Sequence, residues 1–213
     1  MIVFSGGKGP AIFGGKAFVY DRGLRMPMMV RCPEHFHPGL QPGDVIDDLV
    51  SATDIGPTLI DFAGSSVPDY TYGRLFFGPN RQPEPEYSLA IRDRCNSNLI
   101  DQIRSVRSRW YKYIKNFMPK KTYYEVSHNN IAAHPAGHKL YEDGLLPPNQ
   151  AAFYAPKPVE ELCDTSTASY EMKNLAGDPQ HKKTSVAMRR ALETRKAETN
   201  ETGGRKPRRC WRK

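Results

Sequence analysis

Residues 103–114 read Ile-Arg-Ser-Val-Arg-Ser-Arg-Trp-Tyr-Lys-Tyr-Ile and contain two β-type runs joined by a polar connection. Residues 103–106 and 110–114 are rich in β-branched and aromatic side chains, which is the usual composition of strands. The three residues between the runs, 107–109, match the length of a short hairpin loop. The stretch therefore predicts a β-hairpin, and with it an antiparallel sheet in the second half of the chain.

The same hairpin interleaves basic and aromatic side chains, as platforms that bind single-stranded nucleic acid do. A hairpin with one packed face and one solvated face has a similar composition. We favour the second interpretation and do not expect nucleic acid as a partner. The residues concerned are Arg104, Arg107, Arg109, Trp110, Tyr111, Lys112, Tyr113 and Lys115.

Outward from the hairpin, the sequence predicts further short elements and long connections. Residues 54–64 are expected to form a short core helix, with Asp54 at the N-cap and Gly64 as the stop. Residues 118–158 show little periodicity and are predicted to be mostly loop. The other expected elements are strands at 2–4, 28–31 and 87–91 and a helix at 182–198.

The charge of the chain is concentrated at its C-terminal end. The 213 residues carry 31 Lys and Arg against 23 Asp and Glu, a formal net charge of +8. Residues 181–213 hold twelve of the bases and three of the acids, so residues 1–180 have a net charge of −1. We therefore expect a balanced folded body followed by a basic, disordered tail at 200–213.

The apolar runs are all too short for a membrane span or for the core of a signal peptide. The run at residues 1–4 ends at Ser5-Gly6-Gly7. We predict neither feature and assign no compartment.

A glycine-rich stretch at residues 6–16 invites comparison with phosphate-binding loops. It lacks the G-x-x-x-x-G-K-[ST] spacing, because Ala17 follows Lys16 where a magnesium-binding hydroxyl belongs. Glycines next to a lysine still let the backbone approach a tetrahedral oxyanion, so an anion contact at Lys16 stays open.

The histidines and cysteines do not form a recognisable metal motif. His134 and His138 are four residues apart, but Pro135 and Gly137 lie between them, so we expect no shared helix face. H-E-x-x-H and C-x-x-C are both absent. The four cysteines, Cys32, Cys95, Cys163 and Cys210, are scattered and too few for a disulfide scaffold.

Five motifs in order resemble the C-terminal half of a sulfatase of the alkaline-phosphatase-like superfamily. Residues 15–27 resemble G-K-x-x-x-Y-[DE]-x-G-x-R-x-P, and residues 50–64 resemble V-S-x-x-D-x-x-P-T-L-L-D-L-A-G. Residues 73–75, 103–114 and 161–176 are similar to the G-R-S-L step, the hairpin and the closing E-L-Y-D…N-L-A signature of that family. The resemblance implies an α/β fold, namely the end of the sulfatase domain followed by a small antiparallel-sheet and C-terminal-helix subdomain.

The resemblance also implies a chemistry, the hydrolysis of sulfate esters or sulfamates by a formylglycine made within [CS]-x-P-x-R. In the intact family calcium orients the sulfate, substrates are sulfated small molecules or polysaccharides, and members are often periplasmic or secreted. Lys16 matches the family's lysine motif and is the one residue expected to contact sulfate.

The departures from the family pattern concern its catalytic parts. No [CS]-x-P-x-R is present, and the nearest run, at residues 66–70, ends in tyrosine. Gly7 and Lys8 stand where the family has an aspartate and a histidine or asparagine as metal ligands. A lysine ammonium has no lone pair to donate to a cation, so we expect no cofactor in this chain.

The sequence thus predicts the end of a catalytic domain at 1–70, a C-terminal subdomain at 71–199 and the basic tail at 200–213. We expect a sulfatase-like fragment that is inactive alone, a pseudoenzyme by itself. The alternative, from a different class, is a non-catalytic module whose basic tail binds nucleic acid or a sulfated polysaccharide.

Overall fold

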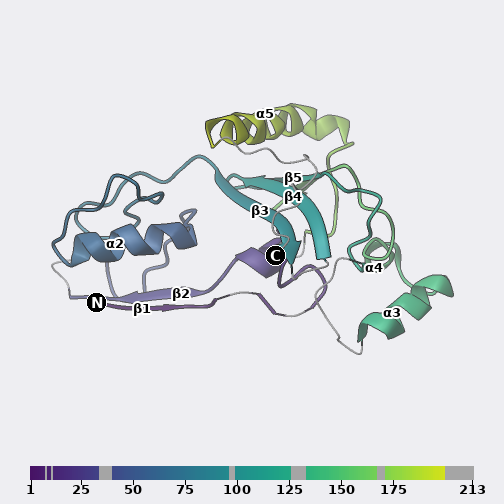
Figure 1. Cartoon of the computed structure of the whole chain (residues 1–213), viewed down its shortest axis with the longest axis horizontal. Coiled ribbons are helices and arrows are strands. Elements are labelled where there is room, and N and C mark those ends of the chain that lie inside the picture. The colour runs from purple at the N-terminus through teal and green to yellow at the C-terminus, as the bar shows by residue number, and fades with distance from the viewer. Residues whose placement is uncertain are drawn as a thin grey trace, which may run out of the picture. The chain divides into compact units, whose positions relative to one another are not determined.

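A computed structural model describes residues 1–7, 9–10, 12–33, 40–95, 99–125, 133–166 and 171–199. Contacts divide the chain into two compact units, which are described separately (Figure 1). The smaller unit comprises residues 1–7 and 26–88, and the larger one comprises residues 8–25 and 89–213. The segment that carries Lys16 therefore belongs with the C-terminal half of the sequence.

The smaller unit contains a two-stranded antiparallel ribbon and one helix. Strand β1 (Ile2–Ser5) pairs with β2 (Met28–Arg31), so that Val3 lies opposite Val30. The 3-10 turn η2 (Ala52–Asp54) leads into α2 (Ile55–Phe62). These elements confirm the strands and the helix predicted for this region.

Helix α2 lies within the predicted range of residues 54–64, but Asp54 acts one turn earlier than expected. Its side chain accepts a hydrogen bond from the Ser51 backbone N–H at 2.9 Å and completes a capping box around η2. The other Asp54 carboxylate oxygen accepts from the Arg74 backbone at 3.0 Å. Gly64 has a φ of +71°, a conformation that glycine adopts without steric cost after a helix.

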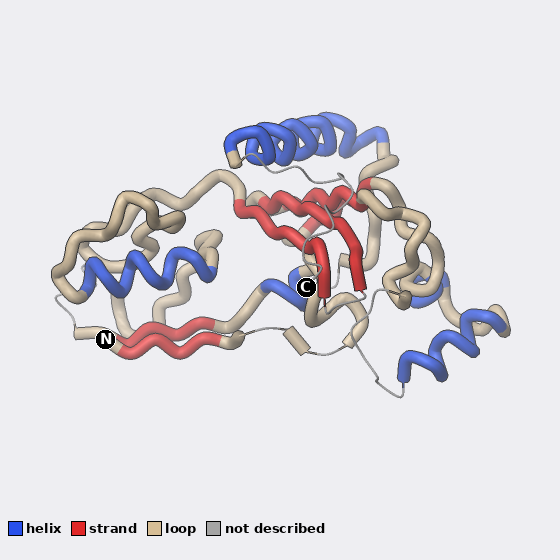
Figure 2. The backbone as a smooth tube through the Cα atoms, viewed as in Figure 1, coloured by secondary structure: helices blue, strands red, loops and turns tan. Residues whose placement is uncertain are grey.

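The larger unit is built on a four-stranded sheet in the order β3-β4-β5-β6 (Figure 2). Strand β4 (Leu99–Arg107) pairs antiparallel with β5 (Tyr111–Asn116), which confirms the predicted hairpin. Strand β3 (Ser88–Cys95) starts one residue after the predicted run. Strand β6 (Glu160–Asp164) pairs antiparallel with β5 and was not expected as a strand from its five residues.

The two faces of this sheet are covered by different parts of the chain. Helix α5 (Lys182–Glu198), confirmed at its predicted position, packs against β4 and β5 and buries Met188 and Leu192 (Figure 1). The opposite face carries Ile103 and Ile114, which pack with residues from the 12–25 segment, among them Phe18. The sheet thus holds the Lys16 segment on one side and the terminal helix on the other.

The prediction that residues 118–158 are mostly loop missed two helices. Helices α3 (Ala133–Glu142) and α4 (Pro148–Ala151) lie within that range. Pro135 stands near the start of α3, where its missing N–H costs no hydrogen bond. Gly137 leaves room for the Tyr154 ring against this helix, because a Cβ there would lie 2.1 Å from the Tyr154 hydroxyl oxygen. Tertiary contact, and not periodicity, specifies this helix.

Two predictions from the sequence are not tested by the described residues. The basic tail at 200–213 lies outside the described residues, and the boundary at residue 70 stays a prediction. Among the described residues, no helix combines the length and the apolar character needed to cross a bilayer.

Glu160 on β6 links α5 to the sheet through two ion pairs. Its carboxylate accepts from the guanidinium of Arg189 on α5 and, at 2.8 Å, from the ammonium of Lys115 on β5. The hydrogen bond from Arg189 is the main reason that the pKa of Glu160 falls from 4.5 to about 2. The pairing therefore stabilises the folded state wherever Glu160 is ionised.

We predict a pH dependence of stability from this carboxylate. The folded state binds the Glu160 proton more weakly than the unfolded chain, so its contribution is present above pH 4.5 and is lost as the pH falls toward 2. Urea unfolding, followed by circular dichroism between about pH 6 and about pH 2.5, should give a shallower decline in the free energy of unfolding for Glu160→Gln than for the wild type. Parallel declines in the two proteins would contradict the assignment.

Candidate functional site: the lysine loop

Lys16 lies in a tight loop, residues 12–20, that precedes the short helix α1 (Asp21–Leu24). We call this segment the lysine loop. The backbone N–H of Lys16 donates to the Pro10 carbonyl at 2.8 Å. A Cβ on Gly15 would approach that carbonyl oxygen to 2.2 Å, so only glycine fits there. Ala17 has a φ of +73°, a left-handed conformation that a residue with a side chain adopts at a steric cost. The surrounding contacts hold the backbone at Lys16 in one conformation.

The first anchor of this loop is the buried carboxylate of Asp21. Its Oδ1 atom lies 2.5 Å from the ammonium nitrogen of Lys112, and its Oδ2 atom lies 3.2 Å from the Arg107 guanidinium. Lys112 is fully buried on β5, and Arg107 is its cross-strand partner on β4. Two cations of the hairpin therefore meet one carboxylate of the Lys16 segment.

Glu171 completes this cluster from a third part of the chain. Its Oε1 atom lies 2.7 Å from the Lys112 ammonium, and Oε2 accepts a hydrogen bond from the backbone N–H of Asp21. Burial raises the pKa of Glu171 above its usual range, in opposition to the effect of the Lys112 charge. Glu171 also has a φ of +52°, so its backbone adopts a costly conformation to reach both partners.

The second anchor is a chain of hydroxyl groups that ends on Glu161 of β6. Tyr20 donates to the Glu161 carboxylate at 2.6 Å and lies 2.8 Å from the Tyr123 hydroxyl. Tyr123 also donates to Glu161, and the Asn116 amide donates to the same carboxylate at 2.7 Å. Burial, followed by the charge of Glu161, raises the pKa of both tyrosines, so each remains a donor at neutral pH.

An aromatic contact holds the N-terminal side of the loop. The Phe13 ring stacks on the buried His134 ring of α3, with 4.6 Å between centroids and 19° between planes. Burial lowers the pKa of His134, which favours the neutral imidazole in this position. The guanidinium of Arg22 donates to the Phe13 carbonyl at 3.2 Å.

The expectation that His134 and His138 share no helix face was wrong, because both lie on α3 one turn apart. Each ring stacks on a different aromatic residue, and the rings of His138 and Tyr124 are 4.7 Å apart. The helix forms in spite of Pro135 and Gly137 for the packing reasons given above. Within the described part of the chain, no group of three His, Cys, Asp or Glu side chains could hold a metal.

Among the other residues that the sequence singled out, Cys163 lies beside the cluster that Glu171 completes, with its thiol sulfur 3.8 Å from the Glu171 carbonyl oxygen. Gly7 belongs to the smaller unit and is exposed, with open space around its Cα. Lys8 lies outside the described residues. Cys163 is a buried free thiol whose pKa is raised by burial, and Cys32 is a half-buried free thiol.

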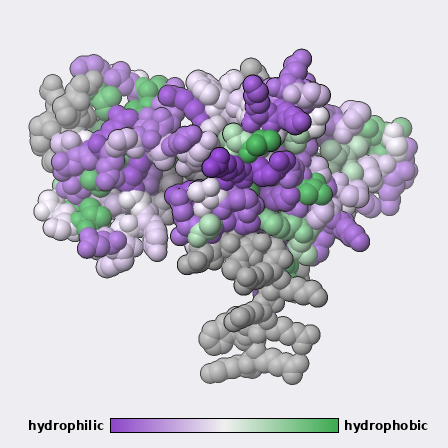
Figure 3. All heavy atoms as spheres, turned by 90° about the horizontal axis from the view of Figure 1, so that it is seen from above, coloured by the Kyte–Doolittle hydropathy of each residue, from purple (hydrophilic) through white to green (hydrophobic). Residues whose placement is uncertain are grey.

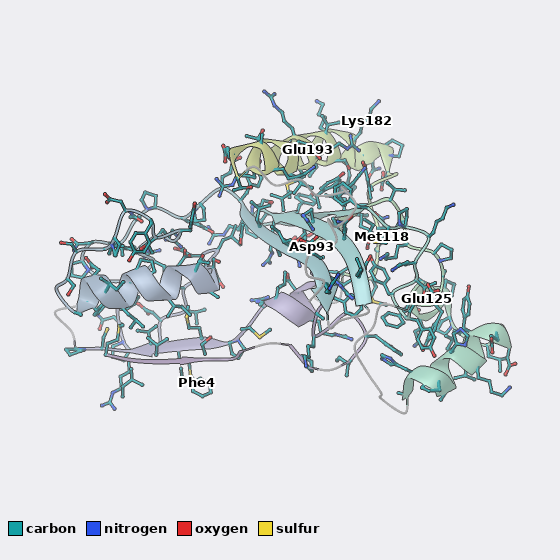
Figure 4. The ribbon with its side chains drawn as sticks, viewed as in Figure 1. Phe4, Asp93, Met118, Glu125, Lys182 and Glu193 are labelled. Atoms are coloured by element: carbon teal, nitrogen blue, oxygen red, sulfur yellow. The ribbon has the colours of Figure 1, made fainter. Side chains whose placement is uncertain are left out.

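The basic and aromatic hairpin is used mainly for packing, as the favoured interpretation had it. Arg104 is buried and its guanidinium lies 2.7 Å from Asp93 of β3, a residue labelled in Figure 4. Lys112 is enclosed by the cluster described above. Only Arg109 and Trp110, at the turn, are exposed members of the set.

Sequence reasoning found Lys16 but missed the residues that hold it. The signal was present in the motifs themselves, because Tyr20 and Asp21 follow Lys16 within one of them. Lys112 lies in the hairpin motif, and Glu161 and Glu171 lie in the closing signature. Alternation along β5 also places Lys112 on the same face as Ile114, opposite Tyr111 and Tyr113. A lysine that shares a face with an apolar residue indicates a buried cation that needs a carboxylate partner.

With this geometry established, comparison with known proteins identifies the class. The family model described as N-sulphoglucosamine sulphohydrolase, C-terminal, matches residues 11–142. The chain therefore belongs to this sulfatase family, and the predicted resemblance is confirmed. An ulvan-active sulfatase of Formosa agariphila is similar to the chain, with 32% identity over 196 residues.

Solved structures support the same fold. A 2-O GAG sulfatase superimposes with a TM-score of 0.57 and 20% identity over 85% of this chain and 32% of that one. A protein bound to its substrate D-glucosamine-2-N,6-O-disulfate gives a TM-score of 0.54 and 18% identity over 87% of this chain and 31% of that one. The alkaline-phosphatase-like α/β fold is thereby confirmed for its C-terminal part. The alignment covers 91% of this chain and 32% of the ulvan-active relative, so the chain spans about a third of that length.

The buried cluster makes a quantitative prediction about stability. Replacing Lys112 by methionine would leave Asp21 and Glu171 buried without their shared cation, which should lower the free energy of unfolding by about 3–5 kcal/mol. Lys139→Met is a matched control, because Lys139 is exposed and pairs with Asp143 in solvent. That change should cost less than about 1 kcal/mol. Urea unfolding measures both, and equal costs would contradict the anchoring role.

Proposed function

We propose that this chain supplies the lysine loop and the C-terminal subdomain of a sulfuric ester hydrolase for sulfated carbohydrates, with Lys16 contacting the sulfate. The observation that carries the proposal is the double anchoring of the lysine loop through Asp21 and Tyr20 to neighbouring strands. A cation that neutralises charge in a transition state is most effective when its position is set in advance. The two anchors supply that positioning for the Lys16 backbone.

The substrate class is supported by the names of the relatives. One is described as active on ulvan, one as a 2-O GAG sulfatase, and one was solved with a disulfated glucosamine. All three descriptions concern sulfated sugars. We extend this class, and not any one substrate, to the present chain.

We further propose that the chain alone does not turn over sulfate esters. Its sequence contains no [CS]-x-P-x-R, so no residue in it can become the formylglycine nucleophile of the family. Lys16 can attract a sulfate group, but it offers no route for the sulfur–oxygen bond to break. Binding without turnover is the expected behaviour.

The residues present do not fit the calcium ion of the intact family. Gly7 has no side-chain oxygen at the position of the family's metal-binding aspartate. Lys8 adds a cation where the family has a neutral donor, and calcium prefers several oxygen ligands. We therefore assign no calcium ligand to this chain and derive no step that uses the ion.

The absence of turnover is directly measurable. The purified chain with 4-nitrophenyl sulfate and calcium chloride should release nitrophenol at the rate of a protein-free control. Turnover above that control, if it is lost in Lys16→Ala, would contradict the proposed inactivity.

Contact of Lys16 with sulfate predicts protection of its amine. A limiting amount of an amine-acylating reagent, followed by peptide mass spectrometry, reports the labelling rate of each lysine. D-glucosamine-2-N,6-O-disulfate at millimolar concentration should slow labelling at Lys16 and leave exposed Lys139 unchanged, whereas unsulfated glucosamine should slow neither. Equal labelling of Lys16 with both sugars would contradict the sulfate contact.

A further inference from the structure

The turn between β4 and β5 presents an exposed tryptophan on a fixed backbone. Trp110 is 57% exposed, although it is the kind of side chain that folding usually buries. Its carbonyl accepts from the Thr165 backbone at 2.9 Å, and the adjacent Ser108 and Tyr111 backbones pair at 2.9 Å. The backbone that carries this exposed indole is thus fixed by hydrogen bonds of the turn, which limits the backbone entropy lost on binding a ligand.

Basic side chains lie beside this ring. The Arg109 guanidinium is 5.7 Å from the centroid of Trp110. The Tyr111 ring meets the His181 ring edge-on, with 5.9 Å between centroids. This contact joins the turn to the beginning of α5, where Lys182 and Lys183 are both exposed.

Lys182 can be located directly in the structure (Figure 4). Figure 4 shows Lys182 at one end of α5, with Glu193 further along the helix. Figure 3, which views the molecule from above, shows a mainly hydrophilic surface in this region. We define the turn surface as Arg109, Trp110, Tyr111, His181, Lys182 and Lys183.

The charge of the turn surface favours an anion. It contains three permanent cations and no acid among its six residues. The nearest carboxylate by register is Asp164, opposite Tyr111 on β6, and it accepts from the Ser166 N–H and hydroxyl at 2.8 and 2.6 Å. Glu193 is likewise engaged, because Lys196 donates to it at 2.9 Å. An anionic ligand would therefore meet three cations on the turn surface, next to carboxylates that already have hydrogen-bond donors.

We propose that the turn surface binds a sulfated polysaccharide chain, with a sugar ring stacked on Trp110 and sulfate groups on Lys182, Lys183 and Arg109. An exposed aromatic ring offers area at low entropic cost, and flanking ammonium and guanidinium groups suit sulfate oxygens. The choice of a sulfated sugar as the anion rests on the proposed function. Lys182 and Lys183 begin α5, which packs on the face of the sheet opposite Phe18 and the rest of residues 12–25, so their contacts with sulfate do not use Lys16.

The test uses the full chain and a fluorescein-labelled heparin octasaccharide, with its desulfated counterpart as the ligand control. The binding variant is Trp110→Ala/Lys182→Gln/Lys183→Gln. The matched variant is Tyr72→Ala/Lys120→Gln/Lys139→Gln, which removes an exposed ring and two exposed lysines elsewhere. Because all these side chains are exposed, both variants should keep the wild-type melting temperature.

We expect the binding variant to raise the Kd for the octasaccharide about tenfold, equivalent to about 1.4 kcal/mol, and the matched variant to leave it within about twofold. The slope of log Kd against log salt should fall by about two in the binding variant, one for each lost lysine. Wild-type affinity for the octasaccharide in the binding variant would overturn the proposal. So would equal losses in the two variants, or equal binding of the desulfated sugar.

Fluorescence gives a second, local readout. The chain has two tryptophans, so Trp211→Phe leaves Trp110 as the only emitter when excitation is chosen to avoid the tyrosines. Heparin octasaccharide should shift or quench its emission, and equal affinity for a single-stranded DNA of the same charge would overturn the assignment to sulfated sugar. An unchanged emission at saturation would also overturn it. These measurements are independent of Lys16 labelling, so either proposal can fail alone.

Discussion

The buried ion pair between Asp21 and Lys112 is the interaction on which the larger unit depends. It joins a segment near the N-terminus to the central strand β5 across 91 positions of sequence. A buried charge is costly unless it is paired and hydrogen-bonded, so neither residue is tolerable inside without the other. Arg107 and Glu171 bring the cluster to two cations and two carboxylates. The pairing therefore selects one docking position for the Lys16 segment.

The two faces of the sheet around this cluster have different roles. The face with Lys112 and Ile114 receives the lysine loop, while the face with Tyr111 and Tyr113 is covered by α5. Because side chains alternate along a strand, a single hairpin can supply both faces with different chemistry. The interleaved bases and aromatics that resembled a nucleic-acid platform are the consequence of this two-sided use.

Much of the fold could be predicted because its local signals are strong. The strands β1 and β2, the hairpin β4–β5 and the helices α2 and α5 each carry their own periodicity or capping residues. Helix α3 has neither signal, because Pro135 and Gly137 disfavour a helix. The residues that it packs against, Phe13 and Tyr154, lie elsewhere in the sequence. Strand β6 is too short to be recognised without β5 as its partner.

The sequence by itself determined the family, the lysine motif at Lys16 and the departures at Gly7 and Lys8, because residue type and spacing are local properties. Only the tertiary structure decided which charges meet. The pairing of Asp21 with Lys112 and Glu171, and of Tyr20 with Glu161, depends on burial and on strand register. These are set when separate segments exclude water from a shared interior, and no single stretch of residues contains that information.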